Sequence, residues 1–335
     1  MRRRRFFAAS AFALACAVAL AFGELIVRLF DLDERFLEKY VYLQGGMFEI
    51  HQADNNPKLL FRLKHGSLDY NHFQASVNRH LARGKEYEKE KPPGVYRIIT
   101  LGGSNVFGAE INDDETWPAR VEQKLRTLTD TPIEVWNYGT SAYVSIQMVE
   151  IARLTIDELN PDLYIFAFSN IGAPAFQARE PKLPIFDANP SLWFDYVFDP
   201  GIIHIPGVWE ERETLAAVRR SRLFRYALMS AVARAKVRRW QAINYEERAI
   251  RDFRAFVEES RDRVKIAVFI CPAAGLQMFE PYWAGFDLPV YVLTADGMPR
   301  EYIRIHPPAY VMPWYADHLA PWLIERGLVP GRSAP

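Results

Sequence analysis

The feature that most constrains the fold is an alternation of short β-rich runs with helical stretches between residues 95 and 293. Apolar, strand-like runs occupy residues 96–101, 133–136, 162–168, 264–270 and 290–293. Thr116 can cap a helix whose first turn holds Pro118, and a second helical stretch runs from Ser145 to Leu159. Strands that alternate with helices predict an α/β fold with a parallel sheet covered on both faces. In such a sheet, functional sites lie at the carboxyl ends of the strands.

The N-terminus has the pattern of a membrane segment. Residues 2–5 are all arginine, and they precede an uncharged run over residues 6–22 that Glu24 interrupts. Such a basic cluster stays in the cytoplasm, so the rest of the chain is expected on the far side of the membrane. The run is short for a spanning helix and slightly long for a signal core. We favour an uncleaved single-pass anchor over residues 1–28, with a cleaved signal segment or lipidation of Cys16 as alternatives.

Composition excludes several classes of function. Lys plus Arg and Asp plus Glu number 41 each, so no net charge draws the chain toward nucleic acid. The chain has two cysteines, Cys16 in the apolar run and Cys271 after a strand-like run, and no Cys/His spacing that indicates zinc. We therefore expect no metal, no cofactor and no disulfide, and a buried free thiol at Cys271.

Changes in pattern along the chain suggest where its parts begin and end. Residues 29–94 are polar and aperiodic, and they end in a run of alternating charges followed by two prolines. They are expected to form an irregular stalk or linker. Residues 95–330 are expected to form one domain, interrupted by a helical insertion over about 170–262. The basic stretch 219–239 of that insertion carries an apolar stripe. It fits a solvated helix packed on the sheet or, alternatively, a helix lying on an anionic membrane surface.

Ser104 is the first candidate for chemistry. It follows Gly102 and Gly103 directly after the first strand, at the edge of the sheet where a hydroxyl can face solvent. The glycines allow a tight turn and close approach of a substrate. A serine nucleophile also needs a base, usually histidine, and N–H donors for the developing oxyanion. Taken alone, Gly-Gly-Ser after a strand fits a structural turn better than a nucleophile.

The surrounding motifs make the pattern more specific. Residues 97–104, followed by Phe107-Gly108 and by residues 115–119, resemble the first block of SGNH/GDSL hydrolases, in the membrane-anchored subgroup with Gly-Gly-Ser. Asn137-Tyr138-Gly139 resembles the second block, in which a glycine N–H helps to form the oxyanion hole. The resemblance implies a flavodoxin-like three-layer α/β/α sandwich with a parallel sheet, preceded by an N-terminal transmembrane helix. The activity it implies is ester hydrolysis.

Two further blocks depart from the family pattern. Asn170, the candidate third oxyanion donor, stands one position early, and Ile171 occupies the usual asparagine position. His306, followed by Pro307-Pro308, resembles the segment that carries the catalytic histidine. The family has an aspartate two or three residues before that histidine, where this chain has Arg304 and Ile303. Without an orienting carboxylate, the tautomer of the histidine is less well fixed.

Asp317 and His318 form a competing pair near the C-terminus. They are adjacent on a predicted helix and point to different sides, so they do not make the usual Asp–His contact. We expect His318 to be a surface or packing residue of that helix.

Two hypotheses for function follow. In the first, the chain is an exported serine ester hydrolase or acyltransferase. Its catalytic residues are Ser104 and His306, and its oxyanion donors are Ser104, Gly139 and Asn170. The substrate would be an acylated small molecule or an envelope glycan or lipid. In the second, the domain has lost catalysis and serves as a binding or assembly component. Both place the domain on the periplasmic side of the cytoplasmic membrane, anchored through the N-terminal helix.

Overall fold

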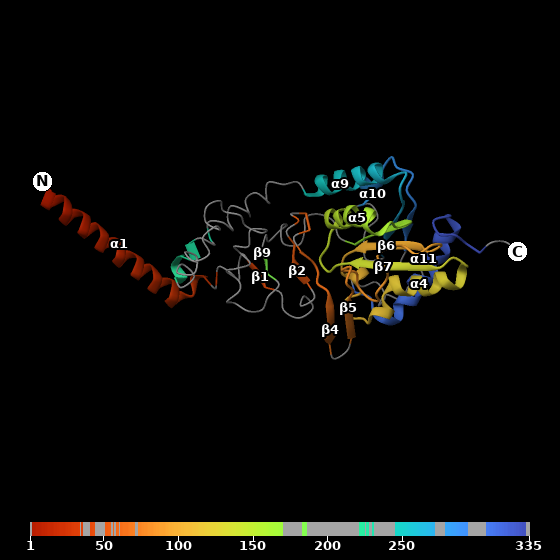
Figure 1. Ribbon diagram of the computed structural model, residues 1–335, viewed down its shortest axis with the longest axis horizontal. Helices are drawn as coiled ribbons and strands as arrows, with labels where there is room; N and C mark the ends of the chain where they lie inside the picture. Colours follow the sequence, from red (N-terminus) through yellow and green to blue (C-terminus); the bar gives the residue numbers. More distant parts are fainter. Residues whose placement is uncertain are drawn as a thin grey trace. The chain divides into compact units, whose positions relative to one another are not determined.

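The computed structural model describes residues 2–33, 35, 41–43, 51–54, 56, 58–59, 61–70, 73–169, 183–185, 221–224, 226–227, 230, 245–271, 279–293 and 306–332. The chain divides into two compact units, drawn in Figure 1. The smaller contains residues 1–46 and 179–242, and the larger contains residues 47–178 and 243–335.

A parallel sheet forms the centre of the larger unit. In its described part this sheet has five strands: β6 (Tyr96–Gly102), β7 (Ile133–Gly139), β8 (Leu163–Phe168), β10 (Lys265–Ile270) and β11 (Val290–Val292). They lie in the order β11-β10-β8-β6-β7, and every neighbouring pair is parallel. Numbered along the chain, this is the flavodoxin-like order 2-1-3-4-5. The predicted fold class is therefore confirmed. Its topological switch point lies between β6 and β8.

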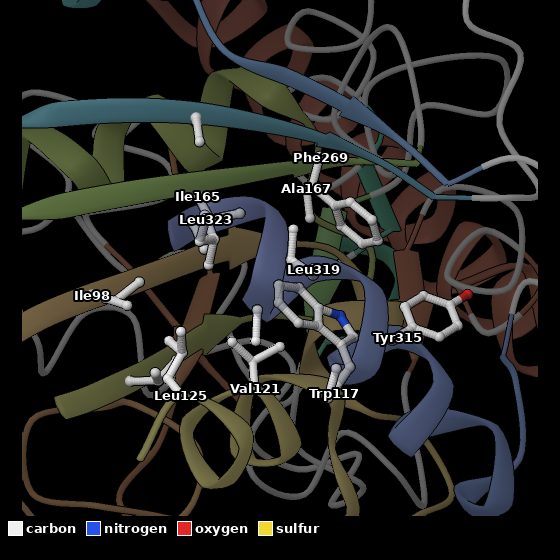
Figure 2. Packing of buried hydrophobic residues seen from close by; sticks show 14 of the residues in the cluster. Ile98, Trp117, Val121, Leu125, Ile165, Ala167, Phe269, Tyr315, Leu319 and Leu323 are labelled. Carbon is white, nitrogen blue, oxygen red and sulfur yellow. The ribbon is translucent and has the colours of Figure 1, made fainter. Parts of the chain in front are cut away.

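One face of the sheet is covered by α4 (Trp117–Leu128) and α11 (Met312–Glu325). Figure 2 shows how these helices and the strands share one core, which has three groups of members. The first group comes from α4 (Trp117, Val121, Leu125), the second from strands (Ile98, Ile165, Phe269) and the third from α11 (Tyr315, Leu319, Leu323). Thr116 caps α4 by accepting a hydrogen bond from the amide of Ala119, as the sequence predicted. This packing fixes the start of α11 against the sheet.

The opposite face is covered by α5 (Ser145–Leu159), α9 (Tyr245–Ser260) and the short α10 (Glu280–Trp283). Figure 1 shows these helices on one side of β6 and β7, with α4 and α11 on the other. Aromatic side chains dominate here. The rings of Phe166 and Phe253 meet edge-on with their centroids 5.1 Å apart, and the ring centroids of Phe168 and Tyr282 are 5.0 Å apart. Alternate residues of β8 thus face two different cores, which makes the unit a three-layer sandwich.

Two hairpins precede the sheet. β2 (His51–Ala53) pairs with β3 (Phe61–Leu63), and β4 (Gly66–Tyr70) pairs with β5 (Phe73–Val77), both antiparallel. Apolar residues of β3 and β5 pack against Phe107 and Ala109, just beyond the first strand of the sheet. These strands lie within the segment 29–94 that was expected to form a stalk. Residues from 47 onward belong to the larger unit, and the short strands bury apolar side chains in it.

Helix α9 lies at the C-terminal end of the expected insertion over 170–262. The unit boundary falls at residue 242, and α9 belongs to the larger unit because Phe253 and Phe256 are fully buried beneath β8. In the smaller unit, β1 (Val41–Leu43) pairs in parallel with β9 (Leu183–Ile185).

The smaller unit begins with α1 (Arg2–Phe30). Within it, the stretch from Arg4 to Phe30 is long and apolar enough to cross a membrane, and none of its most apolar window is buried. This feature agrees with the N-terminal transmembrane helix that the sequence predicted.

Candidate active site

Ser104 occupies the switch point of the sheet. It follows β6 and begins α3 (Ser104–Phe107), a helix of four residues that starts after Gly103 in an extended conformation. Gly108 ends α3 in the left-handed region, with φ 79°, and its amide donates to the Ser104 carbonyl. Because a side chain is strained at this φ, glycine fits the position best. The local sequence therefore forces a sharp strand-to-helix turn with the serine at its apex.

Two glycines let α3 lie directly on the strand ends. A Cβ added to Gly102 would lie 2.1 Å from Cγ2 of Val106, and one added to Gly139 would lie 2.2 Å from the amide nitrogen of Phe107. The second clash is with backbone, which cannot rotate away. Gly139 is thus required for close packing of α3 against β7, a role that the sequence did not indicate.

Asn137 connects α3 to β7. Its Nδ2 donates to the carbonyl of Val106 at 2.8 Å, and its Oδ1 accepts from the amide of Gly139 at 2.9 Å. Asn137 is buried, so both bonds are shielded from water. The Gly139 N–H, which the sequence assigned to an oxyanion hole, therefore already has an acceptor in this structure.

Arg83 holds the other end of α3. It is buried, and its guanidinium donates to the carbonyls of Phe107, Gly108 and Ile111 while Nε contacts Asp113 at 2.9 Å. Burial lowers the pKa of Arg83, and the Asp113 carboxylate opposes that shift. The planar guanidinium thereby donates hydrogen bonds to carbonyls that the end of a helix leaves unpaired. Sequence reasoning missed Arg83, because it lies in a polar segment without periodicity.

His306 reaches Ser104 from the far end of the chain. Its Nε2 lies 2.8 Å from the Ser104 Oγ, and both residues are partly buried. When Nδ1 carries the ring proton, the serine hydroxyl donates to Nε2, the arrangement a general base needs. His306 precedes the short η5 (Ala309–Val311) and then α11. The packing of α11 on α4 thus sets the position of the histidine.

The other sequence candidates fall into two groups. Asn170 lies outside the described residues, as do Ile303 and Arg304, which stand where the family has its aspartate. Asp317 instead pairs with Lys124 at 2.7 Å, and Nδ1 of His318 donates to the carbonyl of Trp314 at 2.8 Å. Both are exposed, so the Asp317–His318 pair takes no part in the contact between Ser104 and His306.

A buried polar pair lies behind the nucleophile. The Nδ2 of Asn105, the residue after Ser104, contacts the thiol of Cys271 at the end of β10. Cys271 is buried and free, as the sequence predicted, and burial raises the pKa of its thiol to about 12. A thiol in this state is a poor nucleophile. Of the two side chains, Ser104 is the one with a base beside it.

The connection after β7 contains a residue other than glycine with a left-handed backbone conformation. Ala142 has φ 67°, and the turn around it is closed by a 3.1 Å bond from the Tyr143 amide to the Thr140 carbonyl. The donor of this hydrogen bond is the amide of Tyr143, and the amide of Ala142 takes no part in it. Ala142 is partly exposed at the carboxyl edge of the sheet. Non-glycine residues with positive φ are concentrated at functional sites.

In the described part of the chain, no group of three His, Cys, Asp or Glu residues is arranged to hold a metal ion. A cavity of about 590 Å³ opens at the opposite edge of the sheet, beside Tyr96, Asp162 and Lys265, where strands begin. It is therefore separate from the contact between Ser104 and His306.

Comparison with known proteins gives a limited picture. No family model and no curated protein sequence matches the chain. Among solved structures, a lipolytic protein of the G-D-S-L family from Desulfitobacterium hafniense matches with 13% identity and a TM-score of 0.36, over 67% of this chain and 98% of that one. The psychrotrophic esterase EstA from Pseudoalteromonas matches with 12% identity and a TM-score of 0.36, over 69% and 98%.

A third match is a variant of Axe2, an acetyl-xylooligosaccharide esterase from Geobacillus. It has 14% identity and a TM-score of 0.33, over 71% of this chain and 97% of that one. These similarities carry no argument about the reaction, for which the evidence is the geometry of Ser104 and His306. The strand order defines the fold, and the solved structures named here as similar to this chain are a lipolytic protein of the G-D-S-L family and two esterases.

Proposed function

We propose that this chain is a membrane-anchored serine ester hydrolase whose nucleophile is Ser104 and whose general base is His306. The observation that carries the proposal is the 2.8 Å contact between Ser104 Oγ and His306 Nε2 at the switch point of a flavodoxin-like sheet. Ligands of such sheets bind in the crevice at this point. The glycines, Asn137 and Arg83 serve to hold the helix that carries the serine.

The proposed reaction has two halves. Ser104 Oγ attacks the ester carbonyl carbon while its proton passes to His306 Nε2. The tetrahedral intermediate collapses, the bond to the alcohol breaks, and the alcohol leaves with the proton from the imidazolium. Water, deprotonated by His306, then attacks the acyl-serine, which releases the acid and returns the proton to Ser104. A sugar hydroxyl in place of water would make the second half an acyl transfer.

The oxyanion of the intermediate needs N–H donors. The amide of Ser104 lies in the first turn of α3, where a helix offers no acceptor of its own. The amide of Ala142 is a second candidate, since the bond that closes its turn does not use it. Gly139 would contribute only after its bond to Asn137 opens. Asn170, outside the described residues, remains the proposed side-chain donor.

The proposed location follows from the N-terminus. The arginines at residues 2–5 stay in the cytoplasm and α1 spans the membrane, so the larger unit lies on the periplasmic side. Acyl or acetyl esters of envelope glycans or lipids are the substrates that such a location offers. A reporter fused after Pro335 should be active only in a form that works outside the cytoplasm. Activity of a strictly cytoplasmic reporter would contradict this topology.

A second candidate function is a catalytically degenerate domain that binds or assembles envelope components. One observation favours it: among the described residues, no carboxylate contacts Nδ1 of His306, and the sequence has Ile303 and Arg304 where the family has its aspartate. A base without an orienting partner can lose orders of magnitude in rate.

A fluorophosphonate probe distinguishes the two candidates. It reacts covalently with an activated serine, so the hydrolase proposal predicts labelling of the wild type and none of Ser104→Ala. His306→Gln, which keeps a polar side chain of similar reach, should slow labelling strongly. Equal labelling of wild type and Ser104→Ala, or none of either, would favour the degenerate domain.

A further inference from the structure

Glu24 of α1 binds the start of a helix that is distant in sequence. Its carboxylate accepts hydrogen bonds from Ser221 Oγ at 2.8 Å, from the amide of Arg222 at 3.0 Å and from the amide of Leu223 at 2.8 Å. Residues 222–224 are helical, and a carboxylate that accepts from the first amides of a helix acts as its cap. Arg28, one turn along α1, donates to the same carboxylate at 2.8 Å.

A second ionic contact reinforces the first. The guanidinium of Arg222 contacts Asp33 through Nε at 3.0 Å and through Nη2 at 2.6 Å, and Nη2 also lies 3.0 Å from Asp31. Asp33 is fully buried, so this pair is shielded from water. The two segments also pack closely, because a Cβ added to Gly23 would lie 2.9 Å from Cδ2 of Leu223. We call Glu24, Asp31, Asp33 and Arg222 the anchor-end cluster.

The depth of Glu24 in a bilayer follows from helix geometry. A rise of about 1.5 Å per residue means that roughly 20 residues cross a hydrocarbon core of about 30 Å. If the span starts after Arg5, Glu24 lies at the far boundary of that core. A carboxylate at this depth is costly unless it is bonded. The bonds to Ser221 and to the amides that follow supply those partners, and they place the start of the second helix at the same level.

We infer that residues 221–224, 226 and 227 form a second contact with the membrane, lying in the headgroup region of the outer leaflet beside the end of α1. The inference rests on the proposed role of α1 as an anchor. Figure 1 shows the short teal helix of this segment beside the red C-terminal end of α1. Exposed apolar side chains among the described residues here include Phe224 on the segment and Leu25, Leu29 and Phe30 on α1. The occupant of this surface is a phospholipid layer, because the side chains that border it belong to the spanning helix itself.

This arrangement favours the membrane-surface interpretation of the basic stretch over a helix packed on the sheet. The described part of the insertion bonds to α1 through Glu24 and Asp33. In the sequence, arginines at 219, 220, 225 and 234 accompany this segment. A basic stretch that also carries an apolar stripe has the composition of an interfacial helix.

Fluorescence quenching by nitroxide lipids tests the inference in the full-length protein. The protein is placed in nanodiscs of phosphatidylcholine and phosphatidylglycerol, in a Cys16→Ala background because Cys271 is buried. Single cysteines at Phe12, Phe30 and Phe224 carry an environment-sensitive fluorophore. A nitroxide deep in the acyl chain should quench the label at Phe12. A nitroxide on the headgroup should quench the labels at Phe30 and Phe224 to a similar extent.

A charge-removing variant tests the cluster itself. Glu24→Gln should abolish quenching of the label at Phe224, while the label at Phe12 should remain quenched. Glu258→Gln, a matched change at an exposed position of α9, should alter neither. Absence of quenching at Phe12 would show that the anchor proposal fails. Quenching at Phe12 without quenching at Phe224 would overturn the second contact alone. Quenching at Phe224 that survives Glu24→Gln would overturn the assignment of the anchor-end cluster as its cause.

Discussion

Gly139→Ala tests most directly whether Gly139 is needed for packing α3 against β7 or only as an N–H donor to the oxyanion. Alanine keeps the backbone N–H, so a residue needed only as a donor would tolerate it. The structure predicts otherwise. The added Cβ would lie 2.2 Å from the Phe107 amide nitrogen, against 3.4 Å for ordinary contact, a shortfall of 1.2 Å. Because the obstacle is backbone, α3 must move away from β7 by a comparable distance.

The expected loss can be estimated from that displacement. Overpacking of this kind costs roughly 1–3 kcal/mol, and a domain of this size loses roughly 2–4 °C of Tm per kcal/mol. Ser104 moves with α3, and a misplacement of about 1 Å can cost on the order of 10²-fold in rate. We therefore expect a lower Tm and a fall of about 10²-fold in kcat/KM for p-nitrophenyl acetate or in the rate of fluorophosphonate labelling.

Gly331→Ala is the matched control. There the added Cβ would lie 3.1 Å from the Cγ2 of Ile324, a side-chain atom that can shift, so Tm and rate should stay near the wild-type values. Calorimetry and steady-state kinetics on the three proteins decide the matter. A Gly139→Ala protein with wild-type Tm and rate would refute the claim that α3 is seated on β7 through this glycine.

Three further predictions concern buried side chains around the site. Arg83→Met should lower the free energy of unfolding by about 3–5 kcal/mol in a denaturant titration, since it removes the ion pair with Asp113 and the donor to three carbonyls. Rescue by Arg83→Lys would contradict the need for a planar guanidinium. Burial lowers the pKa of His51 to about 3 from 6.5, so the unfolded chain binds a proton below pH 6.5 that the folded protein does not. Stability is then lost as pH falls from 6.5 toward 3, by at most about 1.4 kcal/mol per pH unit, and His51→Leu should flatten that slope; an unchanged slope would exclude His51 as its source. Cys271 should react with a thiol reagent only after unfolding, because it is buried and its pKa is raised to about 12; rapid labelling of the native protein would count against this placement.

The sheet and its helices could be predicted because their signals are local. The run from Tyr96 to Leu101 is apolar and β-rich, and the structure has β6 there. The helix expected from Ser145 to Leu159 is α5, with the same ends. Strand alternation then gave the parallel sheet, and the resemblance to a known family gave its flavodoxin-like order.

The support for the nucleophile could not be predicted, since it comes from contacts that are distant in sequence. β2 to β5 are only three to five residues long, too short for a periodic pattern to emerge. Arg83 acquires its role only when the chain brings the end of α3 over it. Gly139 was assigned to oxyanion binding from the resemblance of residues 137–139 to the second family block, and a glycine has no side chain that could indicate a packing role. Its neighbours, Asn137 and Phe107, reveal its role only in three dimensions.

The pairing of Ser104 with His306 is the central claim, and a double-mutant cycle tests it most directly. Hydrolysis of p-nitrophenyl acetate is measured for the wild type, Ser104→Ala, His306→Ala and the double variant. Residues that act as one unit lose rate together, so each single variant should fall to about the level of the double variant. Additive losses, or full activity in either single variant, would contradict the account.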